Sequence, residues 1–198
     1  MLPEQKQTLF FSATMPTAIS NLSRQILQNP VTVKIIPLSS ATDMIEQHLY
    51  YVERQKKNQL LISLLKQELK KSVLIFSRTK HGADKIARIL NKNRIDCEAI
   101  HGNKSQGARQ RVLSNFKLGR TRVIVATDIA ARGIDISDLE LVINYDLPDV
   151  AETYVHRIGR TGRAGKRGTA LTFYSQDEQI MIRNIQRLTG KRLNSVLT

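Results

Sequence analysis

The sequence predicts an α/β fold in which helices cover both faces of a parallel β-sheet. Short runs of β-branched and aliphatic residues alternate with longer amphipathic stretches along the 198-residue chain. The short runs are almost wholly apolar, which is typical of strands buried on both faces of a parallel sheet. Strands that alternate with helices in this way predict βαβ units. Hydrophobic residues make up 41% of the chain, which is enough to form a core.

Each element follows from its own pattern. Five runs are predicted strands, the last two on a weaker signal: residues 73–77, 123–126, 141–145, 47–52 and 170–174. Four stretches place apolar residues on one face of a helix: residues 57–70, 81–91, 106–117 and 177–188. Because the carboxyl ends of parallel strands meet at one edge of the sheet, we expect functional residues in the loops after Ser77, Ala126 and Tyr145.

The first forty residues follow a different pattern. A helix is predicted at residues 17–27, and it is flanked by predicted strands at residues 8–11 and 31–36. The polar stretch 37–43 is typical of a linker, so we expect a domain boundary there. Residues 1–36 are too few to build a core of their own, and residues 44–198 form the main domain.

Basic residues dominate the charge of the chain. Lysine and arginine number 31 against 17 acidic residues, which gives a formal net charge of +14. Such an excess favours a polyanionic partner, most often nucleic acid. The alternative is a basic protein whose charge serves only its solubility.

Several classes of protein do not fit the sequence. No apolar run approaches the ~18 residues that a membrane helix needs, and the N-terminus lacks the layout of a signal peptide. Cys97 is the only cysteine, which rules out an internal disulfide and a cysteine-rich zinc site. The scattered histidines at 48, 81 and 101 show no metal-ligand spacing. We therefore expect a reducing, cytoplasmic setting and no metal site on this chain.

The densest chemical signal is the glycine- and arginine-rich stretch 156–168. It holds five basic residues between Arg157 and Arg167, with glycines at 159, 162, 165 and 168. Glycine allows close backbone approach, and the arginine fork suits phosphate oxygens. Arg160 and Arg163 are three residues apart and would point the same way on a helical turn, toward one phosphate group. The alternative is a solvated basic loop.

A second signal begins where the predicted strand 123–126 ends. Thr127 could donate a hydroxyl to a phosphate, and Arg132 with Gly133 offers a fork beside exposed backbone. Asp135 could accept a hydrogen bond from a sugar hydroxyl. The alternative is an ordinary strand-to-helix turn with Asp128 as the helix cap.

Two further loops could grip a nucleic-acid backbone. Arg78 follows the predicted strand 73–77 and lies between two hydroxyl residues, although these could equally be helix caps. The loop 101–106 leads into a helix on which Gln106 and Arg109 are one turn apart. The chain has only ten phenylalanines and tyrosines and no tryptophan, which leaves little for base stacking. Binding would therefore be to the backbone and independent of base sequence.

The nucleotide-binding motifs that usually cradle phosphates do not occur. The pattern G-x-x-x-x-G-K-[ST] is missing, as is G-x-G-x-x-G. No paired acidic motif is available to hold Mg²⁺. The chain thus has arginines suited to a transferring phosphoryl group without a triphosphate cradle, which indicates half of an active site.

Together these motifs resemble the C-terminal RecA-like lobe of DEAD-box ATP-dependent RNA helicases, most like the bacterial RhlE type. Residues 11–16 resemble the Ser-Ala-Thr motif that closes the N-terminal lobe in this family. Four more stretches resemble C-terminal motifs in the family's order: residues 74–79, Gln106 with Arg109, residues 127–135 and residues 156–163. The resemblance covers about residues 2–190. It implies a P-loop NTPase-like helicase C-terminal domain and, for the whole parent protein, an ATP-hydrolysing RNA helicase.

The resemblance also implies residue roles. Arg160 and Arg163 would be arginine fingers for the ATP γ-phosphate, Asp135 and Gly133 would contact the nucleotide, and His156 would couple the motif to the opposite lobe. Closure of the two lobes would be relayed by Ser12, Ala13 and Thr14. The residues implied along the RNA backbone path are Arg78, Gly102, Gln106, Arg109, Thr127, Arg132 and Gly133. Mg²⁺ would accompany ATP on ligands outside this chain.

The segments that read adenine, hold the phosphates and carry the DEAD sequence itself are missing. We therefore expect a fragment that begins late in the N-terminal lobe and does not hydrolyse ATP alone. Residues 8–11 would lack a sheet partner, so that they are disordered, pack on a neighbour or pair with a second copy of the chain. Three alternatives are a non-enzymatic RNA-binding module, a lobe of another superfamily 2 helicase that acts on DNA, and a basic domain without activity.

Overall fold

The computed structural model describes residues 6–12, 15, 17–33, 43–68, 71–131, 139–162 and 167–196. The chain divides into two compact units, Met1–Ile36 and Pro37–Thr198. Each unit is described by itself below. The larger unit contains the sheet and every loop of the candidate site except residues 11–16.

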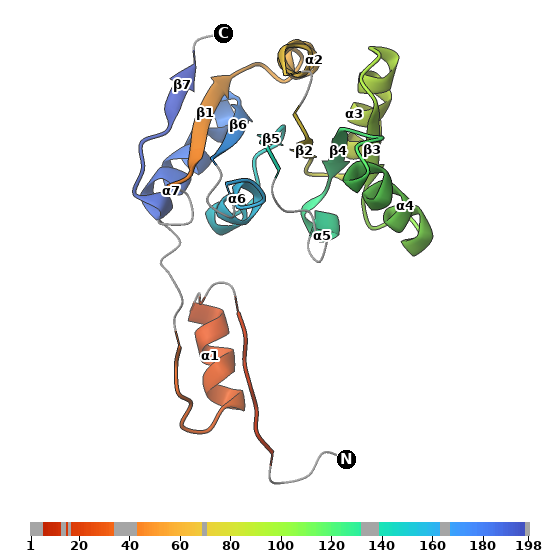
Figure 1. Cartoon of the computed structure of the whole chain (residues 1–198). Coiled ribbons are helices and arrows are strands. Elements are labelled where there is room, and N and C mark those ends of the chain that lie inside the picture. The colour runs from red at the N-terminus through yellow and green to blue at the C-terminus, as the bar shows by residue number, and fades with distance from the viewer. Residues whose placement is uncertain are drawn as a thin grey trace. The chain divides into compact units, whose positions relative to one another are not determined.

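A parallel sheet of seven strands runs through the described part of the larger unit (Figure 1). Its strands are β1 (Ile45–Tyr51), β2 (Val73–Phe76), β3 (Cys97–Ile100), β4 (Val123–Ala126), β5 (Leu141–Asn144), β6 (Gly168–Tyr174) and β7 (Asn194–Val196). They lie in the order β3-β4-β2-β5-β6-β1-β7, and every paired neighbour is parallel. The predicted parallel sheet is confirmed, and all five predicted strands of the main domain are present.

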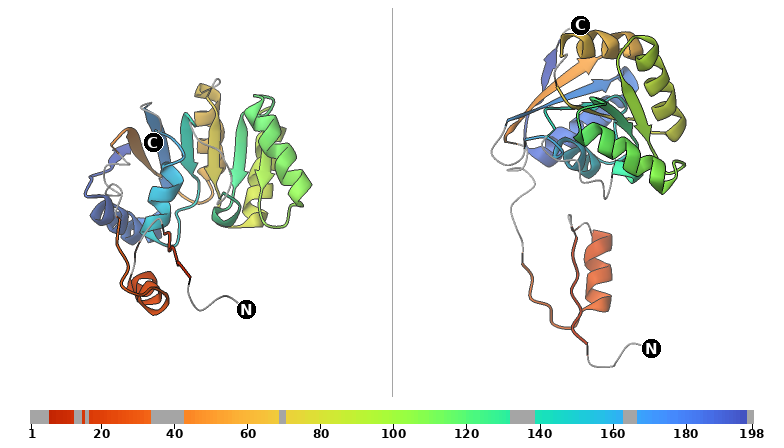
Figure 2. Two further views of the ribbon diagram at one scale, coloured as in Figure 1. Left: turned by 60° about the horizontal axis from the view of Figure 1, so that its bottom comes forward. Right: turned by 45° about the vertical axis from the view of Figure 1, so that its right-hand side comes forward.

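Helices cover both faces of this sheet, as predicted (Figure 2). They are α2 (Lys57–Gln67), α3 (Lys80–Lys92), α4 (Gln106–Lys117), α5 (Asp128–Ala131), α6 (Ala151–Ile158) and α7 (Gln179–Thr189), with the short 3₁₀ turn η2 (Gln176–Glu178) before α7. On one face α2 and α3 pack over the strands, and on the other α4 and α5 cover β4 and β2 while α6 and α7 cover β1 and β6.

The central strands alternate between the two cores. Val73 and Ile75 of β2 pack with α2 and α3, whereas Leu74 and Phe76 pack with α4 and α5. Every residue of β2, β4 and β5 is buried, which explains why these strands are apolar throughout except for Asn144 at the end of β5. This arrangement brings the ends of β2, β4 and β5 to one edge of the sheet.

The smaller unit consists, where described, of helix α1 (Thr17–Ile26) and extended chain on either side of it (Figure 1). None of the residues of α1 is buried, and Phe11 is 87% exposed. The strand predicted at residues 8–11 is wrong, because the described residues 6–12 form no strand. A strand needs a neighbouring strand to pair with, and the described residues of this unit include no other strand. The strand predicted at 31–36 is not seen at 31–33, and its remainder lies outside the described residues.

Candidate functional site

The site is built on three loops that leave the carboxyl edge of the sheet. They follow Phe76 of β2, Ala126 of β4 and Asn144 of β5, and these three strands are neighbours. The edge lies where the sequence predicted it. Helix α5 begins two residues after β4, and α6 follows the loop after β5.

Arg157 joins these loops from the last turn of α6. Its Nε and Nη2 donate to the two carboxylate oxygens of Asp128 at 2.7 and 2.8 Å, and its Nη1 donates to Asn144 Oδ1 at 3.2 Å and to the Asp146 carbonyl at 2.6 Å. The guanidinium also lies 4.9 Å from the centre of the Phe76 ring. Arg157 is only 2% exposed, so its charge is used inside the domain, where it connects α6 to the loops after β4 and β5.

A second buried residue fixes the same helix. Tyr154 of α6 is fully buried, and its hydroxyl donates to Gln47 Oε1 at 2.9 Å. Burial raises the pKa of Tyr154 to about 12, against the smaller lowering effect of a hydrogen bond with Thr172. The helix that leads to Arg160 is therefore anchored on two sides.

Arg160 lies on the turn that follows α6. Thr161 beside it is 1% exposed and forms a β-bridge with Leu139, to whose carbonyl its hydroxyl donates. The Arg160 carbonyl accepts from the Leu139 N–H at 3.3 Å. Gly162 has a φ of +67°, and a Cβ there would lie 2.6 Å from Ile45 Cγ1. This turn therefore requires glycine at 162, and it holds Arg160 in one place.

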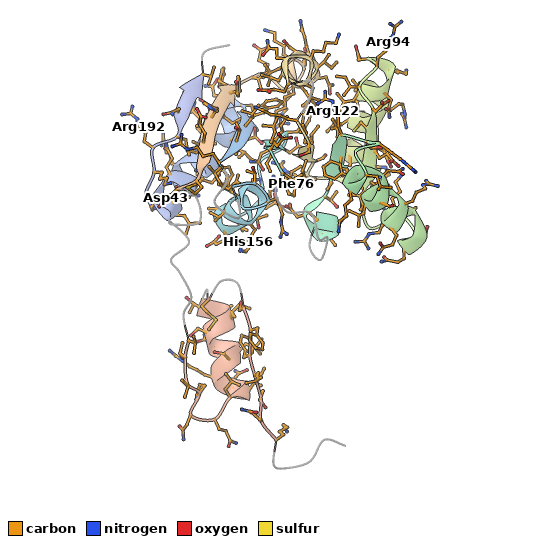
Figure 3. The ribbon with its side chains drawn as sticks, viewed as in Figure 1. Asp43, Phe76, Arg94, Arg122, His156 and Arg192 are labelled. Atoms are coloured by element: carbon orange, nitrogen blue, oxygen red, sulfur yellow. The ribbon has the colours of Figure 1, made fainter. Side chains whose placement is uncertain are left out.

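His156 and Arg160 line a small open pocket on this edge together with Phe76, Asp128, Ala131, Thr153 and Arg157. Figure 3 labels His156 and Phe76, the one at the edge of the unit and the other deeper in the sheet. The pocket has a volume of about 20 Å³, which is room for roughly one water molecule. Within the described residues, this pocket is too small to enclose a nucleotide.

Arg78 follows β2, as predicted, but its contacts are intramolecular. Its N–H donates to Asp146 Oδ2 at 2.9 Å, and its Nη2 donates to the Leu147 carbonyl at 3.2 Å and to Glu178 Oε1 at 3.3 Å. Its Nε lies 3.7 Å from Asp149 Oδ1. The side chain stays about half exposed, so it can also meet an anion from solvent.

Lys57, at the start of α2, completes an ionic network with these acids. Its ammonium group donates to the Tyr145 carbonyl at 3.0 Å and lies 3.7 Å from Asp146 and 3.6 Å from Glu178. The side chain is only 5% exposed. Lys57 therefore ties α2 to the loop after β5 and to η2.

The loop after β3 and the first turn of α4 carry three of the predicted RNA-backbone residues. Gly102 is exposed, with no atom within 4 Å of a would-be Cβ, and Gln106 and Arg109 lie in the first turn of α4. Thr127 lies next to this loop, with its N–H donating to the Ile100 carbonyl at 3.4 Å. The structure thus brings these four residues to the same sheet edge as Arg78 and Arg160.

A buried histidine braces the β3 loop. His101 is 3% exposed, and its Nε2 lies 3.0 Å from Asp84 Oδ2 on α3. Lys104 lies 3.1 Å from the other oxygen of Asp84. Burial alone would raise the pKa of Asp84, but the hydrogen bonds and charges of His101 and Lys104 lower it below its ordinary value. The loop that presents Gly102 is held by this ionised carboxylate.

Other predicted residues are not placed by the structure. Arg132, Gly133, Asp135, Arg163, Ala13 and Thr14 lie outside the described residues. Ser12 is described, exposed, in the smaller unit. Over the described ranges no helix is long and apolar enough to cross a membrane, and no three metal-ligating side chains gather.

Sequence reasoning missed the buried charges behind the site. Arg157, Asp146 and Lys57 were not singled out, and Asp128 was considered only as a helix cap. The available signal was the position of Arg157 between Val155 and Ile158, both buried on α6. A charged residue on such a face needs a partner, and its partner lies 29 residues away in the sequence.

Comparison with known proteins gives consistent matches. The family model described as "Helicase conserved C-terminal domain" matches residues 56–165. The "DEAD-box ATP-dependent RNA helicase CshA" of Geobacillus kaustophilus is 41% identical over 192 residues, which are 97% of this chain and 41% of that protein. CshA of Bacillus subtilis is also 41% identical, over 98% of this chain and 39% of the relative. The chain thus spans about two fifths of the length of these curated relatives, whose names do not support the RhlE type.

Solved structures agree. Saccharomyces cerevisiae Dbp5 L327V, bound to RNA and ADP BeF3, is similar with a TM-score of 0.90 and 31% identity, over 99% of this chain and 52% of that one. A DEAD box protein from Methanococcus jannaschii is similar with a TM-score of 0.74 and 37% identity, over 94% of this chain and 50% of that one. These matches confirm the predicted RecA-like helicase fold.

Proposed function

Because the chain belongs to the helicase conserved C-terminal domain family, as the C-terminal domain of a DEAD-box RNA helicase, we propose that it supplies an arginine finger for ATP hydrolysis and a surface for the RNA backbone. Arg160, and with it Arg163, stabilises negative charge on the γ-phosphate. An N-terminal lobe supplies the triphosphate cradle across a cleft. RNA and ATP then bridge the two lobes, and hydrolysis reopens them.

The position of Arg160 carries this proposal. The residue lies on a turn fixed by Thr161 and Gly162, and it lines a pocket that is, within the described residues, too small to enclose a nucleotide. A cation fixed beside an open pocket suits a phosphate that is presented from outside. Arg157 and Asp128 hold the helix that leads to Arg160.

Other roles extend this proposal by resemblance. Asp135 and Gly133 contact the nucleotide, and His156 couples α6 to the opposite lobe. The RNA backbone runs along the residues Arg78, Gly102, Gln106, Arg109, Thr127, Arg132 and Gly133. The match to a Dbp5 structure that holds RNA and ADP BeF3 supports both ligands.

Magnesium belongs with the nucleotide in this proposal. The described residues bring no three metal-ligating side chains together. We assign its ligands to the N-terminal lobe. When bound, Mg²⁺ neutralises charge on the phosphates. What this chain contributes is the guanidinium of Arg160.

The smaller unit, with Ser12, Ala13 and Thr14, takes part in coupling the lobes. We propose that residues 1–36 pack against the rest of an N-terminal lobe or, without it, against a second copy of the chain. The exposed side chains of Leu9, Phe11, Val31 and Val33 support this. A cytoplasmic setting is supported by the lone, buried Cys97.

The test is ATP hydrolysis by this chain mixed with the N-terminal lobe of a DEAD-box relative, with and without single-stranded RNA. Each component alone should be inactive, and the mixture should show turnover that depends on RNA. Arg160→Ala should lower that turnover by on the order of 10³. The matched control is Arg88→Ala, which removes an exposed arginine of α3 and should leave turnover unchanged.

Two results would contradict the proposal. Turnover that ignores Arg160→Ala would show that the finger lies elsewhere. If covalently joined lobes bind RNA but never hydrolyse ATP, the chain is a non-enzymatic RNA-binding module. A preference for DNA over RNA would instead favour another superfamily 2 helicase.

A further inference from the structure

A second cavity lies at the opposite, amino edge of the sheet. It has a volume of about 420 Å³, and its charged lining residues are Lys66, Arg94, Asp96, Arg120 and Arg122. Figure 3 labels Arg94 and Arg122 at the far side of the larger unit from His156. The cavity is thus separate from the pocket of Arg160. Four cations against one carboxylate make it strongly basic.

Helix ends alone do not account for this charge. The carbonyl ends of α2, α3 and α4 lie at this edge, and cations are stabilising there. Each helix already has a lysine in its last turn, namely Lys66, Lys92 and Lys117. Arg94 and Arg120 come after these helices end, so a different reason is needed for their place in the cavity.

Arg122 forms a rigid wall of the cavity. Its Nη2 donates to the Leu65 carbonyl at 2.8 Å, and its Nη1 donates to the Glu68 carbonyl at 3.0 Å. The residue is half-buried, and burial lowers its pKa from the ordinary value while the charge of Asp96 acts in the other direction. The guanidinium of Arg122 is thus hydrogen-bonded to carbonyls at the end of α2. It adds positive charge to the cavity, but these N–H groups are not available to a ligand.

Arg94 and Arg120 are the two open forks. Across the described ranges, no hydrogen bond or ion pair engages either side chain, and both residues are exposed. Unpaired guanidinium groups that share one concave surface repel each other unless an anion lies between them. The arginine fork matches phosphate oxygens in a bidentate way.

The backbone conformation of Arg94 also favours a ligand-binding role for this side chain. Arg94 has a φ of +62°, in the left-handed region, directly after the last residues of α3. Glycine is the usual residue at this position of a helix end, since it adopts the conformation without strain. The residue before Arg120 is indeed a glycine, Gly119, with a φ of +69°. An arginine at 94 therefore has a conformational cost that the helix end does not explain.

We propose that this cavity binds clustered phosphate groups through Arg94 and Arg120. Its volume falls in the range of small-ligand pockets and exceeds what a single ion needs. Two sources share this chemistry: the phosphates of an RNA backbone that passes the amino edge, and a soluble polyphosphate. The site is independent of the proposed ATPase, because it lies at the other edge of the sheet from Arg160.

The test measures binding of inorganic tripolyphosphate to the full chain by calorimetry, in wild type and in the Arg94→Gly, Arg120→Gln double variant. The Arg94→Gly change relieves the left-handed strain, so loss of binding cannot be ascribed to misfolding. We expect the double variant to bind at least about tenfold more weakly. The control Arg88→Gln removes one exposed cation of α3 outside the cavity and should change affinity less than about twofold.

Two further arms separate the sources and the sites. A 20-nucleotide single-stranded RNA that loses affinity in the double variant identifies the RNA backbone as ligand, whereas loss for tripolyphosphate alone identifies a soluble polyphosphate. Arg160→Ala should leave the sensitivity to Arg94 and Arg120 intact. The proposal is overturned if the double variant and the control weaken binding equally, or if wild type binds neither probe.

Discussion

The guanidinium of Arg157 and the carboxylate of Asp128 form a two-point ion pair, with N–O distances of 2.7 and 2.8 Å, between α6 and the start of α5. The arginine is almost fully buried, and the Asp128 side chain is 30% exposed. The pair therefore links the helix that leads to Arg160 with the loop after β4. Because Arg157 is more deeply buried than Asp128, the loss of stability depends on which of the two side chains is removed.

Asp128→Ala should destabilise the domain by about 2–4 kcal/mol, because it leaves the buried charge of Arg157 without its carboxylate. The partial exposure of Asp128 places the value below that of a fully buried pair. Urea denaturation of wild type and variant gives the free energy of unfolding.

The control for this prediction removes both charges. The double variant Asp128→Ala, Arg157→Met should be more stable than Asp128→Ala alone by at least about 1 kcal/mol, because no unpaired buried charge remains. If the double variant is instead the less stable of the two, Arg157 finds sufficient partners in Asn144 and the Asp146 carbonyl.

Gly162→Ala should cost about 2–4 kcal/mol, more than Gly119→Ala. Both glycines have a positive φ, so an alanine at either position is strained by about 1 kcal/mol or more. Only at Gly162 does the new Cβ also meet a neighbour, Ile45 Cγ1 at 2.6 Å, whereas the space around Gly119 is open. Equal losses in urea denaturation would show that Ile45 can move aside.

Lys57→Ala should destabilise the domain by about 1–3 kcal/mol, since Asp146 and Glu178 lose a buried cation and the Tyr145 carbonyl loses its donor. Its neighbour Lys56 is the matched control. That side chain is 67% exposed in a pair with Glu53, so Lys56→Ala should cost less than about 1 kcal/mol. A comparable loss for the two lysines, measured by thermal unfolding, would contradict a special role for the buried one.

The main sheet could be predicted because its central strands are buried on both faces, and such strands have apolar sequences. Strands β2, β4 and β5 are buried on both faces, and each is an unbroken apolar run except for Asn144 at the end of β5. Asn144 is fully buried and donates to Thr172 Oγ1. The strand β7 could not be predicted in the same way. It has three residues, NSV, of which two are exposed.

The stretch 156–168 shows where local patterns are not enough. Its charge predicts a phosphate-binding loop, and the structure places Arg160 on the turn after α6. However, the same stretch begins inside α6, and Arg157 belongs to the interior. The flanking apolar residues Val155 and Ile158 indicate that Arg157 is buried, but they do not identify its partner, because Asp128 is distant in the sequence. Residues 8–11 show the converse, since an apolar run becomes a strand only when a neighbouring strand is there to pair with it.

The final prediction concerns Cys97, the only cysteine. Burial raises the pKa of its thiol from 9.0 to about 12, with a further raising effect from Glu98 and opposing effects from Arg122 and the Val125 backbone. Since the thiolate is the reactive form, iodoacetamide should label the folded protein far more slowly at pH 8 than the chain unfolded in urea. Equal rates would mean that the β3 strand opens readily.

The raised pKa of Cys97 also makes stability depend on pH. Between about pH 9 and pH 12 the folded state keeps a proton that the unfolded chain releases, so this residue lowers stability as pH rises through that window and has no effect below it. At pH 10.5 the loss should be about 1–2 kcal/mol relative to pH 8. Cys97→Ala removes the thiol, so the difference between wild type and variant in the free energy of unfolding should shift by that amount over this interval. Buried tyrosines titrate in both proteins and cancel in the difference. A constant difference from pH 8 to pH 10.5 would show that the thiol ionises in the folded state as easily as in water.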